Sequence, residues 1–436
     1  MQARDDRELY GRPAAGGAPH AAPAPGAAGA TLGVGATPGV GATPGVGATP
    51  AAGASPAAGA QADRGAPPAA GPAEQFAAGL IELPDALQTP CAIVDVPTLR
   101  RNLTATAELI AAGGARLRPH VKTHSCTELG RWQVEAGARG LTVGTLRMAE
   151  RFAAAGLDDL LIASPVWVTD ETAPRLRALH ERCRIIVGLD GAEAARRLAA
   201  TAAGSDRRLR VLIEVDSGHA RSGVRPELAG ELADEAKREG LEVAGVFTYP
   251  GHAYASPAAP AQAASDQREA LLAAAASLTV AGHEPQIVSG GSTPTSPLPG
   301  DGLTEQRPGT YVFGDLQQVA LGAASHADIA FAIAATVTSN AVRGQLVLDA
   351  GAKALGRDRP PWLEGHGLIA GHPELRVARV FDYHAVVPMP DGVDAPRLGE
   401  VVAVVPNHVC TAAHLADELV LVEDRQILSR WAIDGR

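Results

Sequence analysis

Lysine is nearly absent from this chain. Lysine and arginine together number 38, yet the only lysines are Lys122, Lys237 and Lys353. Arginine can replace lysine where a fixed positive charge is enough, but a guanidinium group stays charged and cannot form a Schiff base. The scarcity of lysine therefore indicates that at least one of the three positions requires an amine.

Cysteine and long apolar runs are also scarce. The four cysteines, Cys91, Cys126, Cys183 and Cys410, lie far apart and form no Cys-x-x-Cys pair. This pattern predicts free thiols in a reducing compartment, and any metal site would combine one cysteine with other ligand types. No apolar run is long enough to cross a bilayer, and the first residues lack the apolar core of a signal peptide. We expect a cytoplasmic protein.

Positive charge is in deficit. The net charge at pH 7 is −10, which argues against nucleic acid or an anionic membrane as the main partner. Hydrophobic residues make up 46% of the chain, which is enough for a large core. A length of 436 residues leaves room for two domains and a tail.

Residues 1–78 contain few side chains that could build a core. They consist mainly of Ala, Gly and Pro, and Gly33 to Pro50 is three copies of Gly-Val-Gly-Ala-Thr-Pro. Burial in such a segment cannot offset the loss of backbone entropy on folding. We therefore predict a disordered tail over this range.

Short apolar strands alternate with helical patterns over residues 79–324. Eight strands are expected, at Leu117–Val121, Leu141–Gly144, Leu160–Ala163, Ile185–Leu189, Val211–Val215, Val243–Thr248, Gln286–Val288 and Thr310–Phe313. The helical patterns between them include Thr127–Glu135, Met148–Ala154, Ala192–Ala202, Glu227–Arg238 and Gln267–Leu278. This alternation predicts an α/β fold, a (β/α)8 TIM-type barrel. We favour it over a doubly wound sheet because the strand count closes at eight.

Residues 325–436 have a different texture. Strands separated by Gly, Pro and Asp turns are expected at Ile329–Thr338, Gln345–Asp349, Arg376–Phe381, Glu400–Val405 and Glu418–Val422. This pattern predicts a C-terminal all-β domain. An earlier strand at Cys91–Val96, followed by a helix from Asn102 to Ala112, precedes the barrel and fits either domain.

Lys122 lies just past the first barrel strand, in Arg118-Pro119-His120-Val121-Lys122-Thr123-His124. The C-terminal ends of barrel strands carry the reacting groups, so this position faces the catalytic mouth. Burial, together with the cations Arg118 and protonated His120, is expected to lower the pKa of the lysine so that a neutral amine can attack an aldehyde. An ordinary strand-end lysine is the alternative.

A candidate phosphate cradle follows the seventh strand, at Ser289-Gly290-Gly291-Ser292-Thr293-Pro294-Thr295. Backbone N–H groups around Gly291 and the hydroxyls of Ser292 and Thr293 suit a phosphate, and barrel phosphate sites commonly follow strands seven and eight. Arg307-Pro308-Gly309-Thr310 can add a further backbone donor. Each motif alone is weak, but an amine and a phosphate cradle at one mouth are expected for pyridoxal 5′-phosphate.

Two further strand ends carry polar side chains. Strand five ends in Glu214-Val215-Asp216-Ser217-Gly218-His219-Ala220-Arg221, which is either a solvated loop or a segment that places Arg221 beside the cofactor ring. Strand six ends in Thr248-Tyr249-Pro250-Gly251-His252-Ala253-Tyr254. Its tyrosines are candidate ring or phosphate contacts, with core packing as the alternative.

Pro406-Asn407-His408-Val409-Cys410 is a candidate metal motif. In an extended conformation, residues i and i+2 point to the same side, so His408 and Cys410 can share one ion. Imidazole plus thiolate favours Zn²⁺, with Mn²⁺ as the weaker choice. Two protein ligands would leave positions for water or substrate, whereas a buried cysteine beside a loop histidine is the alternative. His384 is a further candidate to approach this ion or Lys122.

These pieces together resemble the fold-type III pyridoxal-phosphate enzymes, the family of D-serine dehydratase and D-threonine aldolase. The resemblance runs from about Leu83 to the C-terminus. It rests on Thr89-Pro90, Arg118–His124, Gly290–Pro294, Arg307–Phe313 and Pro406–Cys410. It implies that Lys122 forms the Schiff base, that Tyr254, Thr293, Gly309 and Thr310 hold the cofactor, and that His408 and Cys410 bind zinc. A homodimer is also implied.

The resemblance favours the dehydratase branch, because the aldolases carry an acidic residue where Cys410 stands. It implies a lyase, dependent on pyridoxal phosphate and zinc, that removes water and ammonia from a D-β-hydroxy amino acid such as D-serine or D-threonine. The product is a 2-keto acid. A metal-dependent D-threonine aldolase, an amino-acid racemase and a non-catalytic pyridoxal-phosphate-binding protein are the alternatives. The racemase would leave the metal motif idle, and the non-catalytic proteins lack a β domain.

Two segments depart from the family pattern. After the cysteine, Pro-Thr-Val-Asn-Leu is replaced by Thr411-Ala412-Ala413-His414-Leu415. A Glu-Glu-His-Gly segment is replaced by Phe381-Asp382-Tyr383-His384-Ala385. Both family segments lie near the substrate β-carbon, so the identity of the substrate and the outcome of the reaction stay open.

Overall fold

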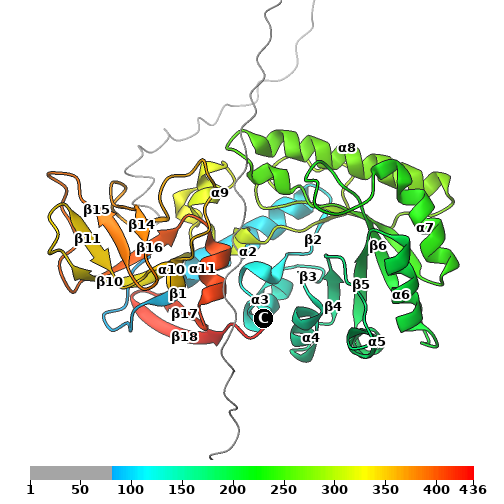
Figure 1. Ribbon diagram of the computed structural model, residues 1–436, viewed down its shortest axis with the longest axis horizontal. Helices are drawn as coiled ribbons and strands as arrows, with labels where there is room; N and C mark the ends of the chain where they lie inside the picture. Colours follow the sequence, from blue (N-terminus) through cyan, green and yellow to red (C-terminus); the bar gives the residue numbers. More distant parts are fainter. Residues whose placement is uncertain (1–80) are drawn as a thin grey trace, which may run out of the picture. The chain divides into compact units, whose positions relative to one another are not determined.

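The described part of the chain, in a computed structural model, comprises residues 81–436. The predicted tail at residues 1–78 lies outside it. No helix of the described part is long and apolar enough to span a membrane. Two sheets organise this part, one in the barrel and one built mainly from the C-terminal residues (Figure 1).

The first sheet has eight parallel strands in the order β2-β9-β8-β7-β6-β5-β4-β3. Their bounds are β2 (Arg116–Leu117), β3 (Leu141–Val143), β4 (Asp159–Ile162), β5 (Arg184–Leu189), β6 (Arg210–Glu214), β7 (Glu242–Phe247), β8 (Ile287–Gly290) and β9 (Glu305–Gln306). The two ends of this order meet, because Thr142 donates its N–H to the Pro119 carbonyl at 2.8 Å and pairs with His120 in a parallel bridge. The ring is closed, and the predicted barrel is confirmed.

Helices follow most of these strands. They are α3 (Thr127–Glu135), α4 (Leu146–Ala154), α5 (Thr172–Arg182), α6 (Ala192–Ala202), α7 (Ala229–Arg238) and α8 (Ala259–Val280). Helix α4 shows why they form: Thr145 caps its first turn by accepting the Met148 N–H, and Leu146, Ala149 and Phe152 are buried. The bounds of α3 and α6 are those that the sequence predicts.

Two barrel strands differ from the prediction. The first ends at Leu117 rather than Val121, and Val121–Thr123 is a 3₁₀ helix, η1. Thr310–Phe313 is not the eighth strand: Thr310–Val312 is a second 3₁₀ helix, η4, and the eighth strand is β9. A short, fully buried apolar run does not show by periodicity whether it is strand or helix, which explains the error.

The second sheet contains ten strands and confirms the predicted β domain. Its main path runs β13-β12-β16-β10-β1-β17-β18, and a branch runs from β10 through β11 and β15 to β14. The bounds are β1 (Cys91–Asp95), β10 (Phe331–Ser339), β11 (Gln345–Leu348), β12 (Gly367–Ile369), β13 (Arg376–Val377), β14 (Arg379–Val380), β15 (Ala385–Pro388), β16 (Val401–Pro406), β17 (Glu418–Glu423) and β18 (Gln426–Ala432). The strand predicted at Arg376–Phe381 is thus split in two.

Strand β1 belongs to the β domain, although it precedes the barrel in sequence. It pairs antiparallel with β10 and parallel with β17, and Figure 1 shows it in blue among later strands. Asp95 then caps helix α2 (Val96–Ala112), which leads into β2. One cluster of buried side chains contains both Leu117 of the barrel and Phe331 of the β domain, so the two regions share a core.

Three short helices complete the surroundings of the barrel mouth. They are α9 (Leu316–Ala320), α10 (Ala352–Leu355) and α11 (Val409–Leu415). Helix α11 packs against η1, which carries Lys122, and the thiol of Cys410 lies 3.5 Å from the Thr123 hydroxyl. The β domain therefore delivers the predicted metal motif to the predicted lysine.

Candidate functional site

A cavity of about 640 Å³ lies at the C-terminal ends of the barrel strands. Six of the predicted site residues line it: Lys122, Arg221, Tyr254, Thr310, His408 and Cys410. A smaller cavity of about 220 Å³ shares Lys122 and Arg221 and adds Gly291 and Arg307. Lys122 thus lies where the two cavities meet.

The amine of Lys122 is surrounded by cations and by an aromatic face. Its Nζ lies 5.1 Å from the centre of the Tyr249 ring, and the guanidinium of Arg221 lies 5.1 Å from the same centre. Burial lowers the pKa of Lys122, the Cys410 thiolate opposes this effect, and Arg221 and Arg307 lower the pKa further. The predicted decrease in its pKa is confirmed, and it favours the neutral, nucleophilic amine.

The cations that act on Lys122 differ from those expected. Arg118 is turned to the opposite end of the barrel, where it pairs with Glu305 and Asp159. Burial and the neighbouring cations hold the pKa of His120 well below its usual range, so this imidazole is neutral at pH 7. His120 instead caps η1, because its Nδ1 accepts the Lys122 N–H at 3.3 Å.

Arg307 has a larger part in the site than the sequence suggested. Its side chain is 5% exposed, donates to the Ser289 hydroxyl at 2.5 Å and donates to the Thr248 carbonyl. Burial lowers its pKa to about 10, although the carboxylates of Glu305 and Glu214 oppose this effect. The sequence motif Arg307–Thr310 predicts only backbone donors. A charged residue at the start of an apolar run is the sequence feature that could have indicated a role for the Arg307 side chain.

The two loops of the predicted phosphate cradle lie side by side. Tyr311 donates its N–H to the Thr293 hydroxyl at 3.2 Å, which ties the loop after β8 to η4. A Cβ on Gly309 would lie 2.8 Å from the His120 carbonyl, so only glycine allows this approach. The N–H groups of Thr293, Gly309 and Thr310 donate to no other group within residues 81–436. These free donors fit a phosphate.

Gly291 and Ser292 contribute differently. The Gly291 N–H donates to the side chain of Gln267 at 2.8 Å, and the Ser292 N–H donates to the Thr295 hydroxyl at 2.9 Å. Both N–H groups therefore shape the loop. Gly291 has a φ of +89° and lines the smaller cavity, and the cofactor contact of either residue stays a prediction.

Tyr254 lies between the cradle and the metal motif. Burial raises the pKa of its phenol well above the usual range, and Tyr249 and Thr310 are its neighbours. Its backbone carbonyl accepts the indole N–H of Trp362 at 3.2 Å, which fixes the loop after β7 against the β domain. The phenol is therefore a neutral hydrogen-bonding group at the edge of the larger cavity.

His408 and Cys410 share the cavity, but not through an extended backbone. His408 is extended, whereas Cys410 lies in the first turn of α11, so the pair spans a strand-to-helix junction. Asp315 anchors this junction: its carboxylate accepts the Val409 N–H at 2.9 Å and lies 3.4 Å from His408 Nδ1. The Nε2 of His408 lies 3.9 Å from Asp358.

The donor chemistry of this pair fits a soft divalent ion. Burial raises the pKa of the Cys410 thiol, but the His408 imidazole, the Thr123 hydroxyl and the Lys122 amine together outweigh that effect and lower the pKa overall. Burial lowers the pKa of His408, but the Cys410 thiolate and the Asp315 carboxylate outweigh it and raise the pKa. A thiolate, the form that ligates zinc, is thus favoured. No cluster of three or more candidate ligands occurs within residues 81–436.

His384 does not join this site. It is exposed and does not line either cavity, and its carbonyl accepts the Phe381 N–H at 2.8 Å. The neighbouring Tyr383 instead accepts a hydrogen bond from Lys353 at 3.0 Å, which leaves Lys122 as the lysine of the cavity. Asp358 and Arg359, which the sequence analysis missed, line the cavity beside the metal motif.

The fold and site define the class. Residues 94–317 match the alanine racemase N-terminal domain family, and residues 330–422 match the serine dehydratase domain family. The chain belongs to the fold-type III pyridoxal-phosphate enzymes, and its relatives place it among their lyases.

Three curated relatives align with this chain over nearly their whole length. D-threo-3-hydroxyaspartate dehydratase of Delftia sp. (strain HT23) is 33% identical over 80% of this chain and 98% of its own. D-threonine aldolase of Arthrobacter sp. is 29% identical over 85% and 96%, and D-serine dehydratase of Dictyostelium discoideum is 27% identical over 79% and 96%. The solved structure of the Delftia enzyme superimposes with a TM-score of 0.74 at 31% identity, covering 80% of this chain and 97% of that one.

Proposed function

We propose that this chain is a lyase, dependent on pyridoxal phosphate and zinc, that removes water and ammonia from a D-β-hydroxy amino acid and releases a 2-keto acid. One observation carries the proposal: Lys122 and the His408–Cys410 pair line the same cavity. An amine alone would serve racemisation. An amine beside a soft metal site suits the removal of a β-hydroxyl group from the same substrate.

The protein groups divide the work by position. Bound pyridoxal phosphate supplies the electron sink that makes the Cα–H bond acidic. The N–H groups of Thr293, Gly309 and Thr310 would hold its phosphate, and the buried guanidinium of Arg307 would face its ring. Lys122 is the base within the cavity, and its lowered pKa suits it to take the Cα proton.

The other end of the cavity would handle the β-hydroxyl and the carboxylate. His408 and Cys410 would hold zinc, which supplies Lewis acidity toward a leaving hydroxyl. Asp315 orients the His408 imidazole through its Nδ1 atom. Arg221 and Arg359 line the cavity as well, and either guanidinium can pair with the substrate carboxylate.

The test is a product assay on the purified holoenzyme. We would incubate it with D-serine, D-threonine and D-threo-3-hydroxyaspartate, with the L-enantiomers as controls, and measure keto acid, ammonia, aldehyde and glycine separately. We expect keto acid and ammonia in equal amounts from at least one D-substrate. Aldehyde and glycine as the main products would show a retro-aldol lyase instead, and racemised substrate alone would exclude both.

Attachment of the cofactor has its own test. Borohydride should fix the cofactor on Lys122, and peptide mapping would locate it. Reduced cofactor on Lys237 or Lys353 would contradict the assignment.

A further inference from the structure

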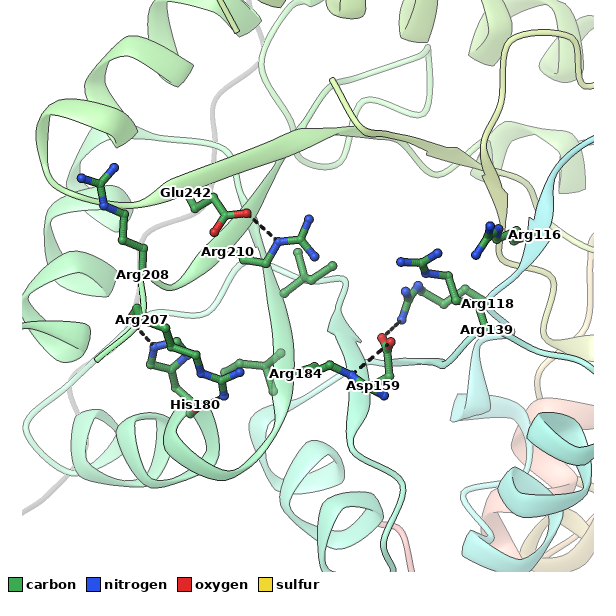
Figure 2. Close-up of a pocket in the computed structure, with 12 residues that line it drawn as sticks. Arg116, Arg118, Arg139, Asp159, His180, Arg184, Arg207, Arg208, Arg210 and Glu242 are labelled. Atoms are coloured by element: carbon green, nitrogen blue, oxygen red, sulfur yellow. Dashed lines mark hydrogen bonds and ion pairs between the residues drawn. The ribbon is translucent and has the colours of Figure 1, made fainter. Parts of the chain in front are cut away.

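A third cavity, of about 520 Å³, lies at the other end of the barrel, where the strands begin (Figure 2). Arg116, Arg184 and Arg210 are the first residues of β2, β5 and β6. Because the strands are parallel, their first residues lie opposite the mouth that carries Lys122. This cavity is thus separate from the catalytic one.

The cavity is lined by arginines in a chain whose net charge is −10. The buried Arg118 is one of the lining residues. Six further arginines line the space: Arg116, Arg139, Arg184, Arg207, Arg208 and Arg210. No lysine takes part. Guanidinium groups bind phosphate through paired N–H donors, so a cavity of this composition suits an oxyanion.

The carboxylates nearby are already engaged. Arg118 pairs with Asp159 at 2.6 Å and with Glu305 at 3.0 Å. The only other acidic side chain of the lining, Glu242, lies 2.9 Å from Arg210. Figure 2 shows the Arg118–Asp159 and Arg210–Glu242 pairs as dashed lines.

Two of the arginines have no such counterpart. Neither Arg116 nor Arg208 forms an ion pair or a side-chain hydrogen bond with any residue from 81 to 436. Their charges are therefore available to a ligand, and in its absence they repel the neighbouring guanidinium groups.

We propose that this cavity binds a phosphate or diphosphate group of a small metabolite. A planar carboxylate is satisfied by one guanidinium fork, whereas a tetrahedral phosphate presents oxygens in several directions. The arginines reach the cavity from several strand starts and loops, which matches the tetrahedral ion. Nucleic acid does not fit, because the arginines line a cavity and the rest of the protein is acidic.

The test must keep phosphate out of the catalytic site. We would use holoenzyme reduced with borohydride, whose cofactor phosphate fills the cradle at Thr293 and Gly309. Isothermal titration with pyrophosphate and with inorganic phosphate, at constant ionic strength set with chloride, should give one saturable site per chain. Binding should also raise the midpoint of thermal unfolding.

Substitutions assign the site. Arg116→Ser combined with Arg208→Ser should weaken pyrophosphate binding at least about tenfold, because each removes a charged donor without breaking an ion pair. Arg343→Ser is the matched control, since Arg343 is an exposed arginine of the β domain without an ion pair in the described residues. Circular dichroism should show that both variants fold.

Three results would overturn the proposal. These are no saturable binding at millimolar pyrophosphate, equal binding by the double variant, or chloride competing as well as phosphate. None of these results would contradict the proposed lyase activity, which the product assay tests separately.

Discussion

The reactivity of Lys122 depends on which charges face it. Arg221 and Arg307 lower the pKa of this amine, while the Cys410 thiolate raises it. The sequence predicts the position of Lys122 at the barrel mouth, but it predicts Arg118 and His120 as the cations that lower its pKa. Their side chains are adjacent in sequence yet serve ion pairing and helix capping, and the direction of a side chain cannot be read from adjacency alone.

Replacing Arg221 with methionine should make the capture of pyridoxal phosphate by the apoprotein slower at pH 7. Loss of this cation raises the pKa of Lys122, so a smaller fraction of the amine is neutral at that pH. Absorbance-monitored reconstitution across pH should therefore show a midpoint displaced toward alkaline pH. The change in midpoint separates this effect from weaker cofactor binding, and Arg343→Met is the control. An unchanged midpoint would contradict the assigned role.

Replacing Cys410 with alanine should reduce elimination at least about a hundredfold, because one of the two proposed zinc ligands is lost. Exchange of the substrate Cα hydrogen in heavy water should continue, since it depends on Lys122 and the cofactor. Chelation should reproduce this pattern, and Zn²⁺ should restore activity better than Mg²⁺. Cys183→Ala, a buried cysteine next to β5, is the control. Full turnover by metal-free protein would refute the metal assignment.

At the scale of elements, closure of the barrel depends on a buried charge cluster. Arg118, 1% exposed, joins Glu305 of β9 and Asp159 of β4, while Arg139, 39% exposed, lies 3.5 Å from the same Glu305. Backbone hydrogen bonds of 2.9 Å also join the segments of β2 and β9, from the N–H groups of Arg116, Arg118 and His120 to the carbonyls of Thr304, Gln306 and Pro308. The buried ion pairs add to this link.

Arg118→Ala should destabilise the protein by about 3–5 kcal/mol, because it removes the buried partner of the Glu305 carboxylate and leaves only the more distant Arg139. Arg139→Ala should cost less than about 1 kcal/mol, since the Arg139 side chain is 39% exposed and Glu305 keeps its bond to Arg118. Urea unfolding of the two variants compares one carboxylate with its buried and its exposed partner. Equal destabilisation would show that burial does not set the strength of these pairs.

The helices and strands differ in how well the sequence predicts them. Helices α3 and α6 were predicted to the residue, because their apolar spacing and flanking turns agree. The pattern at Thr310 predicts a strand where the protein has a 3₁₀ helix, because short buried apolar runs look alike in strands and helices. The His408–Cys410 pair was expected in extended backbone, yet it meets at a helix start. The residue types indicated the chemistry, whereas the junction geometry depends on Asp315, a contact distant in sequence.

At the scale of the whole molecule, β1 joins the two domains. Ile93 and Val94 of this strand are fully buried between β10 and β17. A protein beginning at residue 81 should keep its fold and turnover, because residues 1–78 offer little to bury by composition. A protein beginning at residue 96 should be insoluble, because it lacks β1. Solubility and activity of the two truncations test this. Loss of activity in the first would show that the N-terminal segment contributes to function.

The family resemblance also predicts a homodimer. Sedimentation equilibrium of the holoenzyme should then give about twice the chain mass of 44.5 kDa. A monomer with full turnover would show that one chain contains a complete site.

Strand β1 is synthesised long before the strands with which it pairs. The ribosome makes this strand before the barrel, but its neighbours β10 and β17 emerge only after the barrel is complete. Until then Ile93 and Val94 remain exposed on an unpaired strand, the kind of surface that chaperones shield and that seeds aggregation. The barrel can close early, while the second sheet must wait for nearly the last residues of the chain.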